Sequence, residues 1–472
     1  MGRAFVILAG FLVGSLFHPE STLAQSAKAD AALPSDLEIQ RLIATRVDAE
    51  RRNLGIVVGI VTPSGRRMVS HGRTSLTDPR NLDGDTVFEI GSVTKLFTSV
   101  LLADMVRRGE VDLTDSVFRY LPPHTSRARE DRTITLADLA THTSGLPPWP
   151  SGIPATRDGA LSMATYTRAQ LLNYLSTFQV PADVGQKWMY SNVDAGVLGM
   201  ALAVRANTSY EALLETRVTG PLNLRSTSVD LSDRMRLRLA DGHDAELRVA
   251  PAWNVPILAG AGSLHSSAND LLTFLDAIGR EDGPLAGILP LMLATRRPGP
   301  GIPQALGWWI IAPSPKDDGI IVHDGSTLGF SSGVAYDPRS RTGIVVLSNT
   351  ASAVGDIARH LLRPSIPLTR PAGAAPARTE IPMDPTTFDR LVGRYEPAPG
   401  VGFEVSREAD ALMIQLPDIP RLRLRPGSAR TFYVAENTRI TVTFDLDPEG
   451  RAMGLTLSAP TGTTPAKRIR AH

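Results

Sequence analysis

The chain of 472 residues contains no cysteine, and this absence excludes several kinds of chemistry at once. Disulfides, thiolate metal ligands and cysteine nucleophiles cannot occur. Its nine histidines show neither the H-x-H nor the H-E-x-x-H spacing of a metal hydrolase. We therefore expect a protein that uses no metal and no other cofactor.

Net charge is also nearly absent. The chain has 49 lysine and arginine residues and 48 aspartate and glutamate residues, which gives a formal net charge of +1. This balance does not favour a nucleic-acid partner. A hydrophobic content of 42% is ordinary for a globular protein with a full core, and the length allows more than one domain.

Lysine is scarce, because arginine supplies almost all of the positive charge. Lys95 follows Ser92 by three residues in a stretch, residues 88–98, that predicts a short strand followed by a helix. The two side chains would then lie on one helix face, one turn apart. A desolvated amine can remove the proton of a serine hydroxyl, which an arginine cannot do. We predict this chemistry here; the alternative is a serine near a helix start beside a solvated lysine. The lysines of the chain are Lys28, Lys95, Lys187, Lys316 and Lys467.

Two later tripeptides complete an ordered pattern. The first runs from Tyr190 to Asn192 before a predicted helix, and the second runs from His323 to Gly325 at the predicted end of a strand. Taken singly, Asn192 could be a helix cap and His323 a histidine facing solvent. Their order after Ser-x-x-Lys favours a functional interpretation. For His142 we expect a structural role in holding a loop; the alternative is a catalytic role.

The N-terminus has the features of a secretory signal in residues 1–24. Arg3 supplies a positive start, residues 4–17 are an apolar run, and small residues precede Gln25. The run is short for a membrane span, although an uncleaved anchor is an alternative. We expect a periplasmic or secreted protein with no stable membrane insertion after cleavage.

The remaining chain divides into two predicted domains. Residues 35–367 include a hairpin within 55–70 and an antiparallel meander within 307–348. Residues 368–385 are rich in proline and alanine and predict a linker. Residues 386–472 predict a small all-β domain, a sandwich or a barrel. Its expected strands are 403–406, 412–416, 422–424, 431–434, 440–444 and 455–457.

These motifs, with residues 139–146, 188–192, 259–262 and 345–349, resemble the serine β-lactamase-like hydrolase family. That family includes class C β-lactamases, DD-peptidases and related esterases, and the resemblance covers residues 35–367. It implies an α+β fold: a helix-covered antiparallel sheet, which its first and last strands share, beside an all-helical subdomain. The C-terminal domain resembles the lipocalin-like β domain often appended to such enzymes.

The resemblance also implies a role for each motif residue. Ser92 would attack a carbonyl carbon, while Lys95 and Tyr190 share the general-base work and Tyr190 protonates the leaving group. Asn192 would bind the amide of the substrate, and the backbone N–H groups of Ser92 and Ser326 would form an oxyanion hole. The implied catalytic residues are thus Ser92, Lys95 and Tyr190, and the implied substrate-binding residues are Asn192, His323, Gly325 and Ser326.

One departure bears on the substrate. Penicillin-directed members carry Lys-Thr-Gly where this chain has His323, Asp324 and Gly325. Histidine is mostly neutral at pH 7, and Asp324 adds an acid, so we expect weaker binding of a substrate carboxylate. The partner is expected to be a small molecule or peptide with an amide, lactam or ester carbonyl. Our first hypothesis is a hydrolase of β-lactams or D-alanyl peptides; the alternatives are a carboxylesterase and a penicillin-binding or cell-wall-binding module without turnover.

Overall fold

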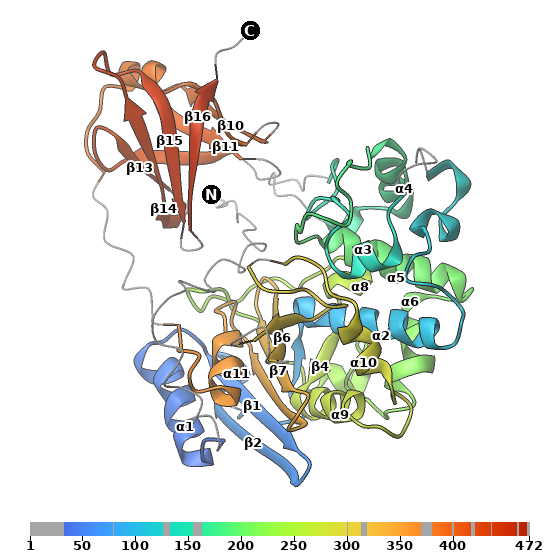
Figure 1. Ribbon diagram of the computed structural model, residues 1–472. Helices are drawn as coiled ribbons and strands as arrows, with labels where there is room; N and C mark the ends of the chain where they lie inside the picture. The colour runs from blue at the N-terminus through green and yellow to red at the C-terminus, as the bar shows by residue number, and fades with distance from the viewer. Residues whose placement is uncertain are drawn as a thin grey trace. The chain divides into compact units, whose positions relative to one another are not determined.

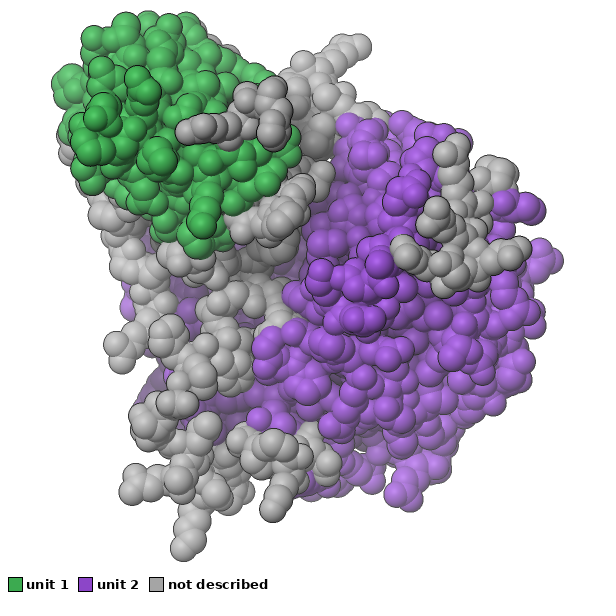
Figure 2. All heavy atoms as spheres, turned by 45° about the horizontal axis from the view of Figure 1, so that its top comes forward, with its two compact units in different colours: residues 1–17, 370–472 green, residues 18–369 purple. Residues whose placement is uncertain are grey.

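The computed structural model describes residues 33–78, 80–125, 133–153, 163–299, 301–312, 319–369, 380–398, 401–416, 421–435, 437–459 and 462–469. The predicted signal and part of the predicted linker lie outside these ranges. The described residues form two compact units, one within 18–369 and one within 370–472, which Figure 2 colours separately. Each unit has its own hydrophobic core.

The larger unit is built on a six-stranded antiparallel sheet in the order β2-β1-β8-β7-β6-β5 (Figure 1). β1 and β2 form the predicted hairpin, and β5 to β8 form the predicted meander. β1 pairs with β8, with Ile56 opposite Ser348, so the first and last strands share the sheet. The strands are β1 Gly55–Thr62, β2 Gly65–Gly72, β5 Trp309–Ile311, β6 Ile320–Ser326, β7 Ser331–Asp337 and β8 Thr342–Ser348, beside a separate pair of β3 Val87–Glu89 and β4 His265–Ser267.

Helices cover both faces of this sheet. A Cβ added to Gly59 would touch a side chain of α9, and one added to Gly333 would touch α11. Gly59 is opposite Val345 and Gly333 is opposite Val346, and neighbouring residues of a strand point to opposite faces. α9 and α11 therefore cover opposite faces, which explains why β1 is an almost unbroken apolar run.

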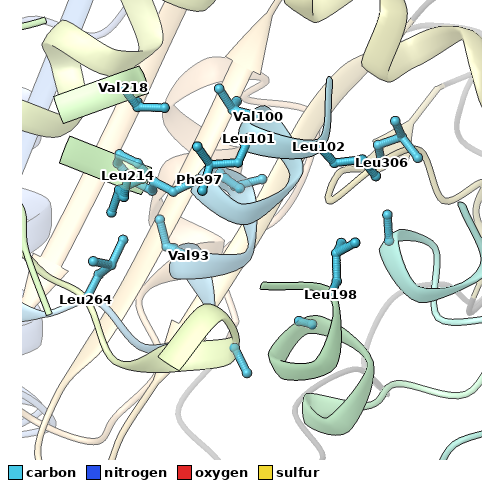
Figure 3. Packing of buried hydrophobic residues seen from close by; sticks show 14 of the residues in the cluster. Val93, Phe97, Val100, Leu101, Leu102, Leu198, Leu214, Val218, Leu264 and Leu306 are labelled. Atoms are coloured by element: carbon cyan, nitrogen blue, oxygen red, sulfur yellow. The ribbon is translucent and has the colours of Figure 1, made fainter. Parts of the chain in front are cut away.

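The helices of this unit are α1 Asp36–Ala44, α2 Thr94–Arg107, α3 Leu136–Ala140, α4 Arg168–Thr177, α5 Asn192–Arg205, α6 Tyr210–Leu214, α7 Asp233–Arg236, α8 Ala259–Gly262, α9 Ala268–Ile278, α10 Ile288–Ala294 and α11 Gly355–Leu362. Within the described ranges, every helix falls short of the length and apolar character that a membrane span needs. α2 lies in the centre, where its residues from Thr94 to Met105 are all buried. Figure 3 shows Phe97 and Leu101 of this helix among apolar side chains of several other elements. This packing fixes the N-terminal end of α2, where Ser92 and Lys95 lie.

The packing of α2 leads to a prediction about stability. Replacing the fully buried Leu101 with alanine should lower the free energy of unfolding by about 2–5 kcal/mol, because the change removes apolar contacts and leaves a cavity. The matched control is Leu237→Ala, at a side chain that is 75% exposed, where the change should stay within about 0.5 kcal/mol. Urea unfolding of both variants measures the difference. Equal stability of the two variants would contradict the central position of α2.

The smaller unit is a closed antiparallel barrel in the order β10-β11-β12-β13-β14-β15-β16-β9. The predicted all-β domain is therefore confirmed, in its barrel form. Its interior holds apolar side chains from around the wall, including the ring pairs Phe388–Phe432 and Phe432–Phe444, whose centroids are 5.9 and 5.6 Å apart. The strands are β9 Gly393–Ala398, β10 Val401–Glu408, β11 Ala411–Gln415, β12 Leu422–Pro426, β13 Thr431–Val434, β14 Asn437–Leu446, β15 Ala452–Ala459 and β16 Gly462–Ile469.

Two barrel strands, β9 and β16, are absent from the sequence prediction. β16 is mostly polar and contains Pro465, which has no backbone N–H to donate. The structure accommodates this proline because Pro465 pairs with Thr456 of β15, whereas the pairing with β9 begins only at Lys467. The prediction of where β6 ends is also wrong: the strand continues past His323 to Ser326, because it pairs with β7 up to Ser331.

Candidate active site

Ser92 lies in a tight turn at the start of α2. A 3₁₀ turn, Gly91–Val93, joins the short strand β3 to this helix, and the Ser92 side chain remains partly exposed. Gly91 has φ +49°, and a Cβ on it would lie 2.7 Å from the backbone nitrogen of Ser326. The missing side chain thus allows the end of β6 to lie directly against the turn that carries Ser92.

Two proton-transfer groups contact the Ser92 hydroxyl. Lys95 Nζ lies 3.1 Å from Ser92 Oγ, and the Tyr190 hydroxyl donates to the same oxygen at 2.6 Å. The three predicted catalytic residues, which come from two distant parts of the chain, therefore meet at one atom. A serine held between an amine and a phenol can lose its proton to one group and receive one from the other.

The surroundings of Lys95 favour its neutral form. Burial lowers the pKa of its amine from 10.5 to about 7. Asn192 Oδ1 at 2.8 Å and the carbonyl oxygen of Ala261 at 2.7 Å accept hydrogen bonds from Nζ. Since a neutral amine has two N–H groups, these two acceptors use both and leave the lone pair for the Ser92 hydroxyl. The site therefore presents a base poised at neutral pH.

Tyr190 is held as a proton donor. Burial raises the pKa of its phenol above the ordinary value, so the hydroxyl remains protonated around neutral pH. The Lys95 nitrogen lies 4.8 Å from the centre of the Tyr190 ring. The phenol O–H points at Ser92 Oγ. It can therefore donate its proton to a leaving group that lies next to Oγ.

The N-terminal end of α5 holds the Tyr190 segment in place. Ser191, and not Asn192, caps this helix, because its side chain accepts the backbone N–H of Asp194 at 3.0 Å. Asn192 is the first helical residue, and its backbone N–H donates to the carbonyl of Pro148 at 3.1 Å. The alternative of Asn192 as a simple cap is therefore wrong, and its side chain is free to contact Lys95.

His323 is buried and neutral. Its Nδ1 lies 2.8 Å from the carbonyl oxygen of Asp324, which can only accept, so Nδ1 carries the proton and Nε2 is an acceptor. The ring stacks on Trp309 with centroids 4.8 Å apart. Burial, and the Lys95 amine when it is protonated, lower the pKa of His323 to about 3. The alternative of a solvent-facing histidine is wrong.

The expected effect of Asp324 needs correction. Arg359 of α11 donates to both carboxylate oxygens of Asp324, at 3.0 and 2.8 Å. The acid therefore faces α11, and its charge is compensated there. Weaker binding of a substrate carboxylate depends on the neutral His323 alone.

Gly325 and Ser326 form the β6 side of the site. A Cβ on Gly325 would lie 2.1 Å from the carbonyl oxygen of Ile90, so this position requires glycine. Ser332 Oγ donates to the same Ile90 oxygen at 2.8 Å, which ties β7 to the turn before Ser92. These contacts bring the backbone of Ser326 beside that of Gly91, as a shared oxyanion site requires.

His142 occupies the structural position that the sequence suggested. Its carbonyl accepts the N–H of Met189 at 2.8 Å, and its Nδ1 accepts the N–H of Ser191 at 3.3 Å. It thereby binds the chain on both sides of Tyr190. The sequence reasoning missed three neighbours: Ala261, whose carbonyl binds Lys95, and Trp309 and Asp194. Of these, only Ala261 lies in a segment that the sequence singled out, residues 259–262, as part of the family resemblance.

A family model described as Beta-lactamase matches residues 39–363, most of the larger unit. This chain belongs to the beta-lactamase family. A second model, a domain of unknown function (DUF3471), matches residues 377–468. The family therefore covers the part of the chain that contains the candidate site, and the barrel corresponds to a separate domain model.

Named relatives agree with this assignment. The chain is 30% identical over 308 residues to the D-alanyl-D-alanine-carboxypeptidase/endopeptidase AmpH of Escherichia coli strain K12, covering 62% of this chain and 78% of that protein. It is 25% identical over 395 residues to penicillin-binding protein 4* of Bacillus subtilis strain 168, covering 77% and 84%. The predicted hydrolase of the β-lactamase and DD-peptidase type is thus confirmed.

A solved structure supports the fold. The β-lactamase/D-alanine carboxypeptidase from Pseudomonas syringae matches with a TM-score of 0.60 at 23% identity, over 70% of this chain and 98% of that chain. The predicted β-lactamase/transpeptidase-like fold, a helix-covered antiparallel sheet with a helical part, is therefore confirmed for the larger unit.

Proposed function

We propose that this chain is a serine hydrolase that acts through an acyl-enzyme on β-lactams or D-alanyl peptides. The observation that carries the proposal is the position of Ser92 Oγ, 3.1 Å from Lys95 Nζ and 2.6 Å from the Tyr190 hydroxyl. The named relatives, a D-alanyl-D-alanine-carboxypeptidase and a penicillin-binding protein, support the substrate class. The features of residues 1–24 support a site of action in the periplasm or outside the cell.

In the proposed reaction the neutral Lys95 amine accepts the proton of Ser92 while Oγ attacks the carbonyl carbon. Backbone N–H groups of Ser92 and Ser326 bind the oxyanion that forms. Tyr190 gives its proton to the leaving nitrogen or oxygen, and the protonated Lys95 amine returns one to Tyr190 and is neutral again. In deacylation this base takes a proton from a water molecule whose oxygen attacks the acyl carbon; the bond from that carbon to Ser92 Oγ then breaks, Oγ receives the proton, and the product leaves as a carboxylic acid.

A carboxylesterase is the second candidate, and the state of His323 favours it. Nδ1 of this residue donates to its neighbouring backbone carbonyl, so the ring offers a neutral acceptor where a lysine would offer a charge. A neutral acceptor gives a substrate carboxylate no electrostatic attraction. Binding of an ester that has no carboxylate would not be weakened by histidine in place of lysine at this position.

Incubation with a penicillin tests the main proposal. Mass spectrometry should show an adduct of one penicillin on Ser92, and the adduct should be absent from Ser92→Ala. A substrate panel of a cephalosporin, a D-Ala-D-Ala peptide and a butyrate ester then ranks the candidates by kcat/KM. Rapid ester cleavage without any β-lactam adduct would replace the proposal with the esterase, and one product per enzyme on every substrate would indicate a binding module.

A further inference from the structure

Asp194 is a buried carboxyl group that the proposed reaction does not use. It lies in the first turn of α5, and its side chain is fully covered. Ser144 Oγ donates to Asp194 Oδ1, and the same hydroxyl accepts the N–H of Leu146 at 2.9 Å. The other oxygen, Oδ2, has no hydrogen-bond partner among the described residues and lies 3.5 Å from His142 Nδ1.

The hydrogen bond of His142 shows which partner that oxygen faces. The backbone N–H of Ser191 donates to His142 Nδ1 at 3.3 Å, so Nδ1 presents a lone pair and carries no proton. An ionised Asp194 would place its unpaired negative oxygen against this lone pair, inside the protein, where an unpaired charge is costly. A protonated Oδ2 would carry no charge there, and its O–H could share the Nδ1 lone pair with the Ser191 N–H. The geometry therefore fits the neutral acid.

The charged and titratable groups around Asp194 agree with this reading. Burial raises the pKa of Asp194 well above its usual range, and the charge of Asp138 acts in the same direction, whereas the hydrogen bond from Ser144 and the amine of Lys95 oppose it. Lys95 Nζ already contacts three other oxygen atoms and forms no ion pair with Asp194 within the described chain. The groups that face this region are Lys95 of α2, Asp138 of α3, His142, Tyr190 and His323 of β6.

We propose that Asp194 is a positioning residue that works as a neutral carboxylic acid. Its neutral Oδ2 packs against Nδ1 of His142 at 3.5 Å without opposing the lone pair there. His142 in turn holds Tyr190, because it binds the chain on both sides of the phenol and its ring lies 4.7 Å from the Tyr190 ring. Being uncharged, Asp194 also leaves Lys95 without a counter-ion, so the amine stays neutral. This inference rests on the proposed function, because it concerns the support of the two proton-transfer groups.

Two substitutions at this position separate the neutral acid from an ionised one. In Asp194→Asn the amide is also neutral, its oxygen can still accept from Ser144, and its N–H group can face His142 Nδ1. We expect kcat/KM within about threefold of the wild type, and the acid limb of its pH profile, set by Lys95, at the same pH. In Asp194→Leu both contacts are lost, and kcat should fall by more than about tenfold with a small change in KM.

Infrared difference spectroscopy gives a readout that needs no turnover. The spectrum of wild type minus Asp194→Asn at neutral pH should contain the C=O stretch of a protonated carboxylic acid. Carboxylate bands in its place would overturn the proposal. So would an acid limb displaced in Asp194→Asn by about one pH unit or more to lower pH, because removing a neighbouring negative charge lowers the pKa of Lys95.

The two proposals fail in different ways. A wild type that hydrolyses no substrate of the panel contradicts the proposed function, while the infrared spectrum still reports the state of Asp194. Full activity of Asp194→Leu contradicts the positioning role. If Asp194→Leu does not fold, Asp194→Asn and the spectrum decide.

Discussion

Replacing Ser92 with alanine is expected to lower kcat by about a million-fold, because removal of the nucleophile leaves the base and the acid with no group to act on. The side chain is partly exposed and small, so the fold should be kept. Steady-state turnover of a chromogenic cephalosporin, or of a nitrophenyl ester if the panel favours esters, measures the loss. Circular dichroism and urea unfolding verify that the variant is folded.

The matched control for this variant is Ser340→Ala. Ser340 lies exposed in the turn between β7 and β8, and its side chain takes no part in the site. It should keep wild-type turnover. If Ser92→Ala retained more than about one per cent of the activity, the nucleophile would have to be another group, since base and acid alone cannot supply a covalent route.

Replacing Lys95 with arginine is the second prediction with a large effect. Arginine also ends in nitrogen atoms but stays positively charged and does not deprotonate, so it cannot accept the proton of Ser92. We expect kcat/KM to fall by about 10²–10⁴-fold, the usual contribution of a general base. The wild-type profile should lose activity as the pH falls through about 7, because protonation of Lys95 removes the base, and this limb should disappear in Lys95→Arg.

Lys187→Arg is the control for this change. Its side chain is 82% exposed and pairs with Asp183 at 2.6 Å, so arginine can replace it with little effect. pH profiles of kcat/KM for both variants and the wild type provide the measurement. A Lys95→Arg variant with wild-type activity, or a wild-type profile that is flat across pH 7, would show that another group takes the proton.

The catalytic residues could be predicted from the sequence because the side chain of each one is suited to a particular chemical role. Ser92, Lys95 and Tyr190 occur in a fixed order, and a chain that otherwise uses arginine keeps an amine at position 95. The hairpin and the meander were predictable for a similar reason: alternation and turn residues are local signals. The joint role of the three residues then required only that the segment with Ser92 and Lys95 should lie beside the segment with Tyr190.

Contacts made by tertiary packing could not be predicted in this way. Nothing local shows that Arg359, 35 residues further on, binds Asp324. The protonated nitrogen of His323 depends on a carbonyl oxygen whose position only the folded β6 defines. Asp194 resembles any acid in the first turn of a helix, where a negative charge is favourable. Only the fold shows that its Oδ2 is buried without a hydrogen-bond partner among the described residues. β16 was missed because its polar residues and Pro465 resemble a loop.

The filled barrel limits what the C-terminal domain can contribute. An eight-stranded wall of this kind is just wide enough either for side chains or for one small guest. Here Tyr395, Phe432 and Phe444 take that space, and the ring centroids of Tyr395 and Phe444 are 6.0 Å apart. Apolar side chains therefore occupy the described interior of the barrel. Any ligand or partner of this domain would therefore contact its outer wall or its rims. Substitutions of the buried interior residues would instead lower the stability of the domain.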